Sequence, residues 1–138
     1  MFFFSRRKEM EVQGFMLKLL NTNCSELEAM VEGPRLDRRV NLTIVVLVVP
    51  VQKGELQIEK TFAAVTKGFS TTGVSLVLNA ARQLDEVILG FRWEFGMKFV
   101  LAKSKHVNPM GAGFYQAGMH MIRVVHPDEY PVLESLSF

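Results

Sequence analysis

Apolar and polar residues alternate with a period of two through most of residues 40–125. This period puts successive side chains on opposite faces of a β-strand. Residues 40–49 are instead mostly apolar, which suits a strand covered on both faces, and we expect that strand to end at Pro50. The clearest alternating faces are Val87, Leu89, Phe91, Trp93 and Phe95, and then Tyr115, Ala117, Met119 and Met121.

Turn signals divide this region into short segments. Lys53 with Gly54 predicts one turn, and residues 108–113, with one proline and two glycines, predict a hairpin connection. After a bend at Gly96, residues 97–103 continue the β pattern. Short strands with regular turns and no helices between them predict an antiparallel barrel or sandwich, and the length suits a barrel of six or seven strands.

The two ends of the chain have a different pattern. Residues 1–33 predict an N-terminal helical segment, in which Ser25 and Glu28 form a capping box for a second short helix. Residues 34–125 form the barrel, and residues 126–138 form a short C-terminal helix or tail. The apolar stripe of the first helix either docks on the barrel, pairs with another chain or lies on a membrane surface. That stripe consists of Val12, Phe15, Met16, Leu19 and Leu20.

Composition narrows the class of protein. The chain has 138 residues, 49% of them hydrophobic, and a net charge of +2, so it can fold as one domain but has no strong field for nucleic acid. Its one cysteine, Cys24, cannot form an internal disulfide. The apolar run at residues 44–51 is too short for a transmembrane helix. We expect a soluble, cytoplasmic protein with no transmembrane segment and no nucleic-acid partner.

Two stretches carry candidate binding chemistry. Arg35, Arg38 and Arg39 lie on the connector before the first strand, and residues 68–73 form a turn of small residues between two strand segments. An arginine can hold a phosphate with two hydrogen bonds and also stack on a base. The structural alternatives are a solvated linker for the arginines and an ordinary turn for Ser70 and Gly73.

This combination resembles the PilZ domain family, small six-stranded barrels that bind cyclic di-GMP. Arg35 and Arg39 match the family's Arg-x-x-x-Arg arm, and Ser70 and Gly73 match the last two fixed positions of its [Asp/Asn]-x-Ser-x-x-Gly motif. Residues 113–121 resemble its closing strand. The resemblance implies that the two arginines clamp phosphates and guanine edges. It also implies that Ser70 offers a hydroxyl and Gly73 leaves room; Arg38 matches no fixed position but is expected to assist.

The chain departs from the motif at Gly68, which stands where the family has an acidic or amide side chain. Losing such a hydrogen bond costs about 1–3 kcal/mol, roughly five- to a hundred-fold in affinity. The resemblance therefore leaves two functions open: a cyclic di-GMP receptor or adaptor with a weakened site, or a protein-interaction and oligomerisation module that binds no nucleotide. The partners expected are cyclic di-GMP, an unknown protein effector and a possible second copy of the chain.

Other chemistry finds little support in the sequence. His106, His120, His126 and Cys24 have no spacing typical of a zinc site, and no phosphate-binding loop or hydrolase nucleophile motif is present. The alternation around Trp93 favours burial in the core over a base-stacking surface. We therefore expect no enzyme activity, no metal and no cofactor.

Overall fold

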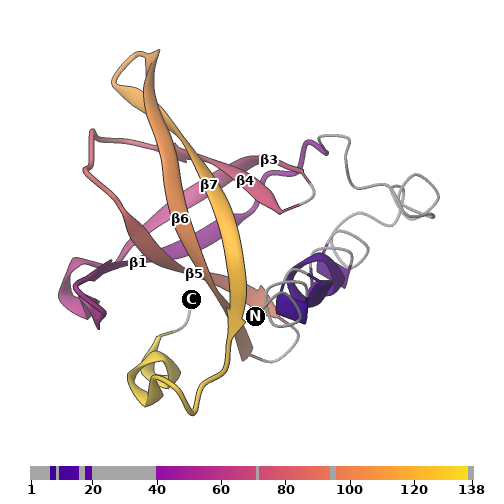
Figure 1. The fold of residues 1–138 in the computed structure, drawn as a ribbon. Helices are drawn as coiled ribbons and strands as arrows, with labels where there is room; N and C mark the ends of the chain where they lie inside the picture. Colours follow the sequence, from indigo (N-terminus) through magenta and orange to yellow (C-terminus); the bar gives the residue numbers. More distant parts are fainter. Residues whose placement is uncertain are drawn as a thin grey trace.

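The computed structural model describes residues 7–8, 10–15, 18–19, 40–70, 72–93 and 96–136. Within these ranges no helix is long and apolar enough to cross a membrane. The described part contains one antiparallel sheet and two short 3-10 helices (Figure 1). The strands are β1 (Val45–Gln52), β2 (Glu55–Leu56), β3 (Phe62–Phe69), β4 (Gly73–Leu78), β5 (Glu86–Trp93), β6 (Gly96–Gly111) and β7 (Phe114–Val125), and the 3-10 helices are η2 (Ile58–Lys60) and η3 (Pro131–Ser135).

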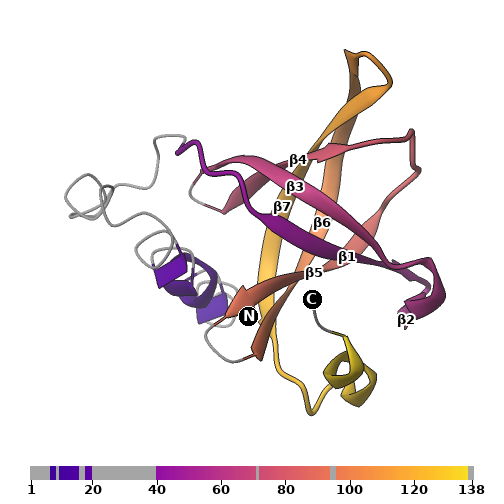
Figure 2. The ribbon, with the colours of Figure 1, turned by 180° about the vertical axis from the view of Figure 1, so that it is seen from behind.

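The sheet closes on itself. Its strand order is β2-β1-β3-β4-β7-β6-β5, and β1 also pairs with β5, from Val46 opposite Phe91 to Val51 opposite Glu86. Apart from the two-residue β2, the strands therefore form a closed six-stranded antiparallel ring, visible from behind in Figure 2. The predicted all-β, six-stranded barrel is confirmed.

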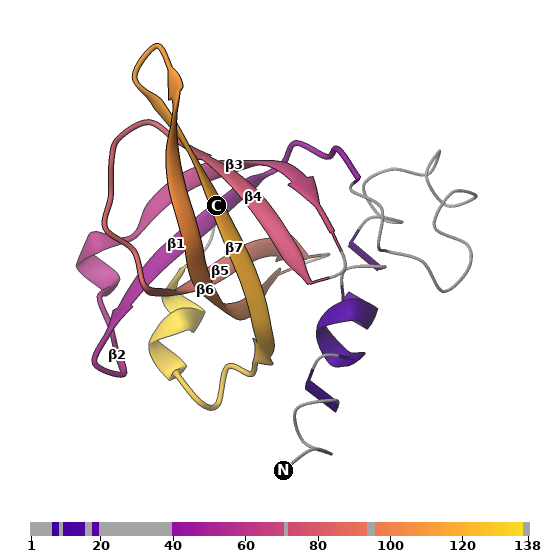
Figure 3. The ribbon, with the colours of Figure 1, turned by 45° about the horizontal axis from the view of Figure 1, so that its top comes forward.

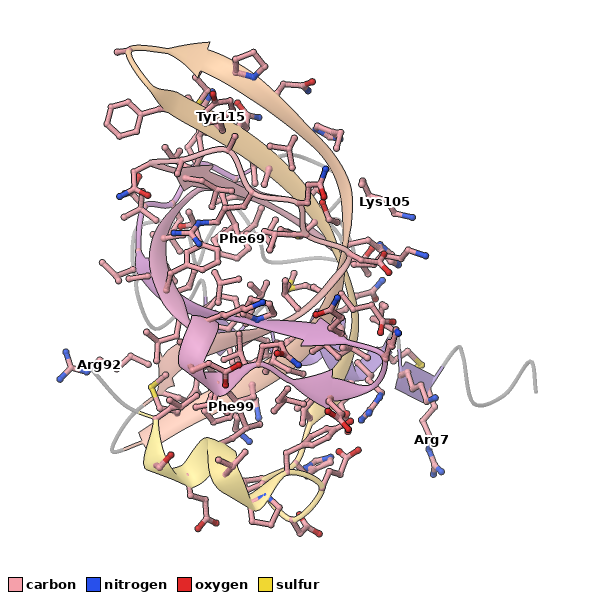
Figure 4. All side chains as sticks on the ribbon, turned by 90° about the vertical axis from the view of Figure 1, so that its left-hand side faces the viewer. Arg7, Phe69, Arg92, Phe99, Lys105 and Tyr115 are labelled. Carbon is pink, nitrogen blue, oxygen red and sulfur yellow. The ribbon has the colours of Figure 1, made fainter. Side chains whose placement is uncertain are left out.

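Alternating apolar side chains fill the inside of the ring. Val46, Leu76, Leu89 and Phe91 are fully buried there, as the period-two pattern predicted. Phe69 lies inside the ring in Figure 4, with its ring centroid 6.4 Å from that of Phe91. These side chains belong to the main hydrophobic core.

A second apolar cluster explains why β1 and β5 are buried on both faces. Val49 and Ile88 point outward from the ring, where Leu133 of η3 packs against them with none of its surface exposed. The C-terminal residues thus cover the outside of these strands, which confirms the predicted short C-terminal helix packed on the barrel.

The N-terminal helix packs on the barrel. The described residues between 7 and 19 are helical, and Val12, Phe15 and Leu19 are buried in the main core. The Phe15 ring centroid lies 5.3 Å from that of Phe91 and 5.2 Å from that of Trp93. Figure 3 shows this helix, in indigo, beside the barrel. Of the three predicted roles for its apolar stripe, the structure supports docking on its own domain; the second predicted helix lies outside the described residues.

Both ends of the first strand differ from the predicted residues 40–49, and β1 begins only at Val45. Strand β1 continues through Pro50 to Gln52 instead of ending at the proline. The Pro50 carbonyl accepts the Gln57 N–H at 2.8 Å, and the nitrogen of a residue in an antiparallel pair faces the same side as its carbonyl. On that side β1 pairs with β3 only as far as Val48 and with β2 only from Val51. The Gln57 carbonyl accepts the Lys60 N–H at 2.9 Å instead, so the missing N–H of Pro50 leaves no ladder acceptor without a donor.

The other differences are reversals of chain direction. Residues 97–103 do not continue β5 past a bend; Trp93 pairs with Gly96, so β6 turns back along β5. The last hairpin also turns later than predicted, because β6 runs to Gly111. A two-residue turn follows at Ala112 (φ 56°) and Gly113 (φ 83°), the conformation of a tight hairpin. As a result, the β6–β7 hairpin projects beyond the ring (Figure 1).

Candidate functional site

Three of the predicted site residues meet in one cavity. Gly68, Ser70 and Gly73 line a hollow of about 260 Å³ where β3 turns into β4. The other three predicted residues, Arg35, Arg38 and Arg39, lie outside the described residues. The cavity thus contains the motif half of the predicted site.

Close packing holds the β3–β4 turn. The Ser70 N–H donates to the Gly73 carbonyl at 2.9 Å. A Cβ at Gly73 would lie only 2.7 Å from Ser70 Oγ, closer than real Cβ atoms approach an oxygen. A Cβ at Gly73 would therefore require the Ser70 hydroxyl to move; the role that the family resemblance implies for Gly73 stays a prediction.

The backbone before β1 is tied to the same turn. Val40 donates its N–H to the Phe69 carbonyl at 2.7 Å, and Phe69 donates its N–H to the Val40 carbonyl at 2.8 Å. Phe69 itself lines the cavity, between Gly68 and Ser70. Arg39 precedes Val40 by one peptide unit, about 3.8 Å between Cα atoms. Val40, the residue that follows the arginine segment in the sequence, is therefore bonded to a residue that lines the cavity.

A row of four paired residues crosses the outside of the barrel at the cavity. Gly68 pairs with Ser75, Ser75 with Gly118, and Gly118 with His106, on strands β3, β4, β7 and β6. The neighbours of Ser75 on β4, Val74 and Leu76, belong to the core inside the ring, so Ser75 faces outward. Because the two glycines on either side of Ser75 have no side chains, this row forms a hollow.

Ser75 is unusual in this row. It is only 6% exposed, and its Oγ has no hydrogen-bond partner among the described residues. Buried hydroxyls are nearly always paired, so this one needs an explanation.

The walls of the cavity are polar and contain basic groups. Lys105 and His106 come from β6, and Gln116 and His120 from β7. Thr72 Oγ1 lies 3.3 Å from His120 Nδ1. The Lys105 side chain points away from the ring in Figure 4. None of the described residues that line the cavity is acidic, and residues 96–125 contain no aspartate or glutamate, so the site suits an anionic or neutral polar ligand.

Sequence reasoning overlooked part of this site. From the sequence, His106 and His120 are considered only as zinc ligands, and Ser75 is not singled out. These residues come together through cross-strand register, which no local motif encodes.

A larger cavity, of about 640 Å³, lies at the opposite end of β3. There the Arg82 guanidinium carbon lies 3.8 Å from the centroid of the Phe62 ring. Acidic and basic side chains both line this cavity, and it contains none of the predicted site residues. We therefore take the smaller cavity at Ser75 as the candidate site.

Comparison with known proteins adds little. No protein-family model matches the chain, and no curated protein matches it. Among solved structures it is similar to the inhibitor of motility MotI/DgrA of Bacillus subtilis, at 14% identity and a TM-score of 0.48, over 75% of this chain and 49% of that one. The chain thus spans about half the length of that protein. The functional argument rests on the residues of the cavity.

Proposed function

We propose that this protein is a non-catalytic cyclic di-GMP receptor or adaptor that acts in the cytoplasm of a bacterial cell. The observation that carries the proposal is the meeting of Gly68, Ser70 and Gly73 in one cavity, with Val40 bonded to Phe69 beside them. The motif residues and Val40, which follows the arginine segment in the sequence, are separated along the chain but adjacent in the fold.

The size of the cavity suggests which part of such a ligand would enter it and which part would stay at its rim. Sites for drug-sized ligands usually occupy about 300–1,000 Å³. A hollow of about 260 Å³ suits one base of a dinucleotide, with the phosphates at its rim. Arg35 and Arg39 would close over those phosphates with bidentate hydrogen bonds, and Arg38 would add charge.

Ligand binding would become a signal through the arm. An arginine segment fixed against the barrel presents a different surface from one that is not, and a protein effector can distinguish the two. The proposal requires no chemistry on the ligand and no cofactor.

An interaction module that binds no nucleotide is the second candidate. It is favoured by Gly68, which gives the cavity no acceptor side chain at the motif position. It is also favoured by Met110 and Phe114 near the hairpin tip, which are 44% and 47% exposed. Apolar side chains at the end of a projecting hairpin suit contact with a protein effector or a second copy of the chain.

Isothermal titration with cyclic di-GMP tests the receptor proposal. We expect saturable binding that falls at least about ten-fold in Arg35→Ala and in Arg39→Ala, since each loses a charge-assisted contact. Arg92→Ala is the matched control, because Arg92 is exposed on β5 and points away from the barrel (Figure 4). No binding heat at about 100 μM ligand would reject the receptor and leave the interaction module.

A further inference from the structure

We propose that Ser75 is the residue that reads the ligand's base, in place of the acceptor side chain that position 68 lacks. This inference rests on the proposed function and adds a specificity-determining residue outside the family motif. The ligand class it selects is a purine whose edge carries ring and exocyclic N–H donors beside a carbonyl, as guanine does.

The first argument is the state of the hydroxyl. Ser75 Oγ is buried, lines the cavity and has no partner in the described part of the chain. Burying a hydroxyl without a hydrogen bond lowers stability, and an alanine would avoid this loss at a position of similar size. A bound ligand that supplies the missing partner gives the serine a function.

The second argument is the cross-strand geometry. Directly opposed residues of an antiparallel pair have Cβ positions about 5 Å apart on the same face. Ser75 is directly opposite Gly68, so its hydroxyl lies beside the place where a side chain at position 68 would begin. A serine hydroxyl donates one hydrogen bond and accepts others, so it can accept a guanine N–H or donate to a guanine carbonyl.

The neighbours of Ser75 across the sheet are both glycines. Gly68 and Gly118 therefore place no side chain beside the buried Ser75 hydroxyl from either neighbouring strand. Beyond Gly118, the His106 imidazole leans over the glycine: a Cβ at position 118 would lie 2.8 Å from His106 Nε2 and 3.0 Å from Nδ1. The exposed His106 ring therefore forms the far wall of a slot whose floor is Ser75.

The test compares Ser75→Ala with the wild-type protein in titrations with cyclic di-GMP and cyclic di-AMP, alongside thermal unfolding. We expect Ser75→Ala to bind cyclic di-GMP about five- to ten-fold more weakly and to lose preference for it over cyclic di-AMP. Its unfolding temperature should be unchanged or higher, because the Ser75 hydroxyl has no hydrogen-bond partner in the described part of the free protein. Ser135→Ala removes a hydroxyl in η3, away from the cavity, and should leave binding unchanged.

The outcomes separate the two proposals. If the wild-type protein binds cyclic di-GMP and Ser75→Ala binds equally well with the same preference, the Ser75 inference is wrong and the receptor stands. A parallel fall in affinity and unfolding temperature would assign the hydroxyl a structural role and also overturn the inference. If the wild-type protein binds neither dinucleotide, the proposed function fails, and the role of Ser75 fails with it.

Discussion

Val40 and Phe69 exchange both of their backbone hydrogen bonds, at 2.7 and 2.8 Å, although they lie far apart in the sequence. Both residues lie outside the ladder of β1, which begins only at Val45. This isolated bridge holds Val40, the residue that follows the arginine segment in the sequence, beside the β3–β4 turn. Its strength should therefore affect ligand binding as well as stability.

Val40→Pro tests that connection. Proline has no N–H, so the substitution removes the hydrogen bond to the Phe69 carbonyl while every arginine stays in place. We expect unfolding free energy to fall by about 1–3 kcal/mol and cyclic di-GMP affinity to fall with it. Urea unfolding and calorimetric titration measure the two effects.

Val40→Ala is the control for this experiment, because it shortens the side chain and keeps the N–H. It should bind more tightly than Val40→Pro. Equal affinities for the two variants would mean that the bridge does not position the arm.

Thr66 should be essential for the backbone conformation of residues 42–44, which lead into β1. Its buried hydroxyl donates to the Leu42 carbonyl at 2.6 Å and accepts the Ile44 N–H at 2.9 Å. Thr66→Val keeps the shape but leaves both backbone groups without this partner, so we expect a loss of about 2–3 kcal/mol in unfolding free energy. Thr66→Ser keeps the hydroxyl and should lose only about 1 kcal/mol for the missing methyl. Equal losses would show that packing matters here and the hydroxyl does not.

Gly118 and His106 should be energetically coupled. When Gly118→Ala is made alone, the new Cβ forces the His106 ring outward. This offsets the stability that alanine usually adds over glycine in a strand. In the His106→Ala protein the same substitution should stabilise by about 0.5–1 kcal/mol. Unfolding of the four proteins of this double-mutant cycle gives the coupling energy. A zero coupling would place the imidazole away from Gly118 in solution.

Glu129 should contribute a small, pH-dependent stabilisation of the C-terminal residues. Its carboxylate accepts the His126 backbone N–H at 2.9 Å, and this bond, with a 2.7 Å contact to Arg123, holds the pKa of Glu129 below its usual value of 4.5. A lowered pKa means that the folded state favours the charged form. The stabilisation is therefore present above pH 4.5 and is lost as the pH falls through the folded pKa.

Thermal unfolding of Glu129→Gln across this range measures the effect. At neutral pH the variant should be less stable by under about 1 kcal/mol, because solvent screens this surface pair, and the difference should vanish in acid. Glu134→Gln serves as the control, since Glu134 is exposed on η3 with no hydrogen-bond partner in the described part of the chain. A difference that persists at low pH would show that the charge of Glu129 is not its source.

The barrel could be predicted because its information is local. Phe91 and Met119 alternate with residues of the other face, and this period alone places them inside a sheet. The predicted end of the first strand at Pro50 was wrong, although a proline usually ends a strand. Its effect depends on whether a neighbouring strand needs its N–H, which the sequence does not reveal.

The candidate site was predictable only in part for a related reason. Ser70 and Gly73 lie on one turn, so a motif detects them. Ser75 and His106 come together through two pairings, of Ser75 with Gly118 on β7 and of Gly118 with His106 on β6. Strand β6 also shifts register between Leu101 and Ala102 and again between Ser104 and His106. Each shift changes which residues face each other, and no short pattern in the sequence specifies the resulting register of β6 against β7.

The projecting hairpin leaves a strand edge open. Strand β5 pairs with β6 only as far as Lys103, while β6 runs on to Gly111, so its outer edge beyond Lys103 has no neighbouring strand in the described part of the chain. Open edges can recruit strands from other molecules and start aggregation. Lys105 adds a charge to this edge, Pro109 removes a donor, and the register shifts interrupt it. These are protective features of natural sheets, so the hairpin can extend into solvent without becoming a template for fibrils.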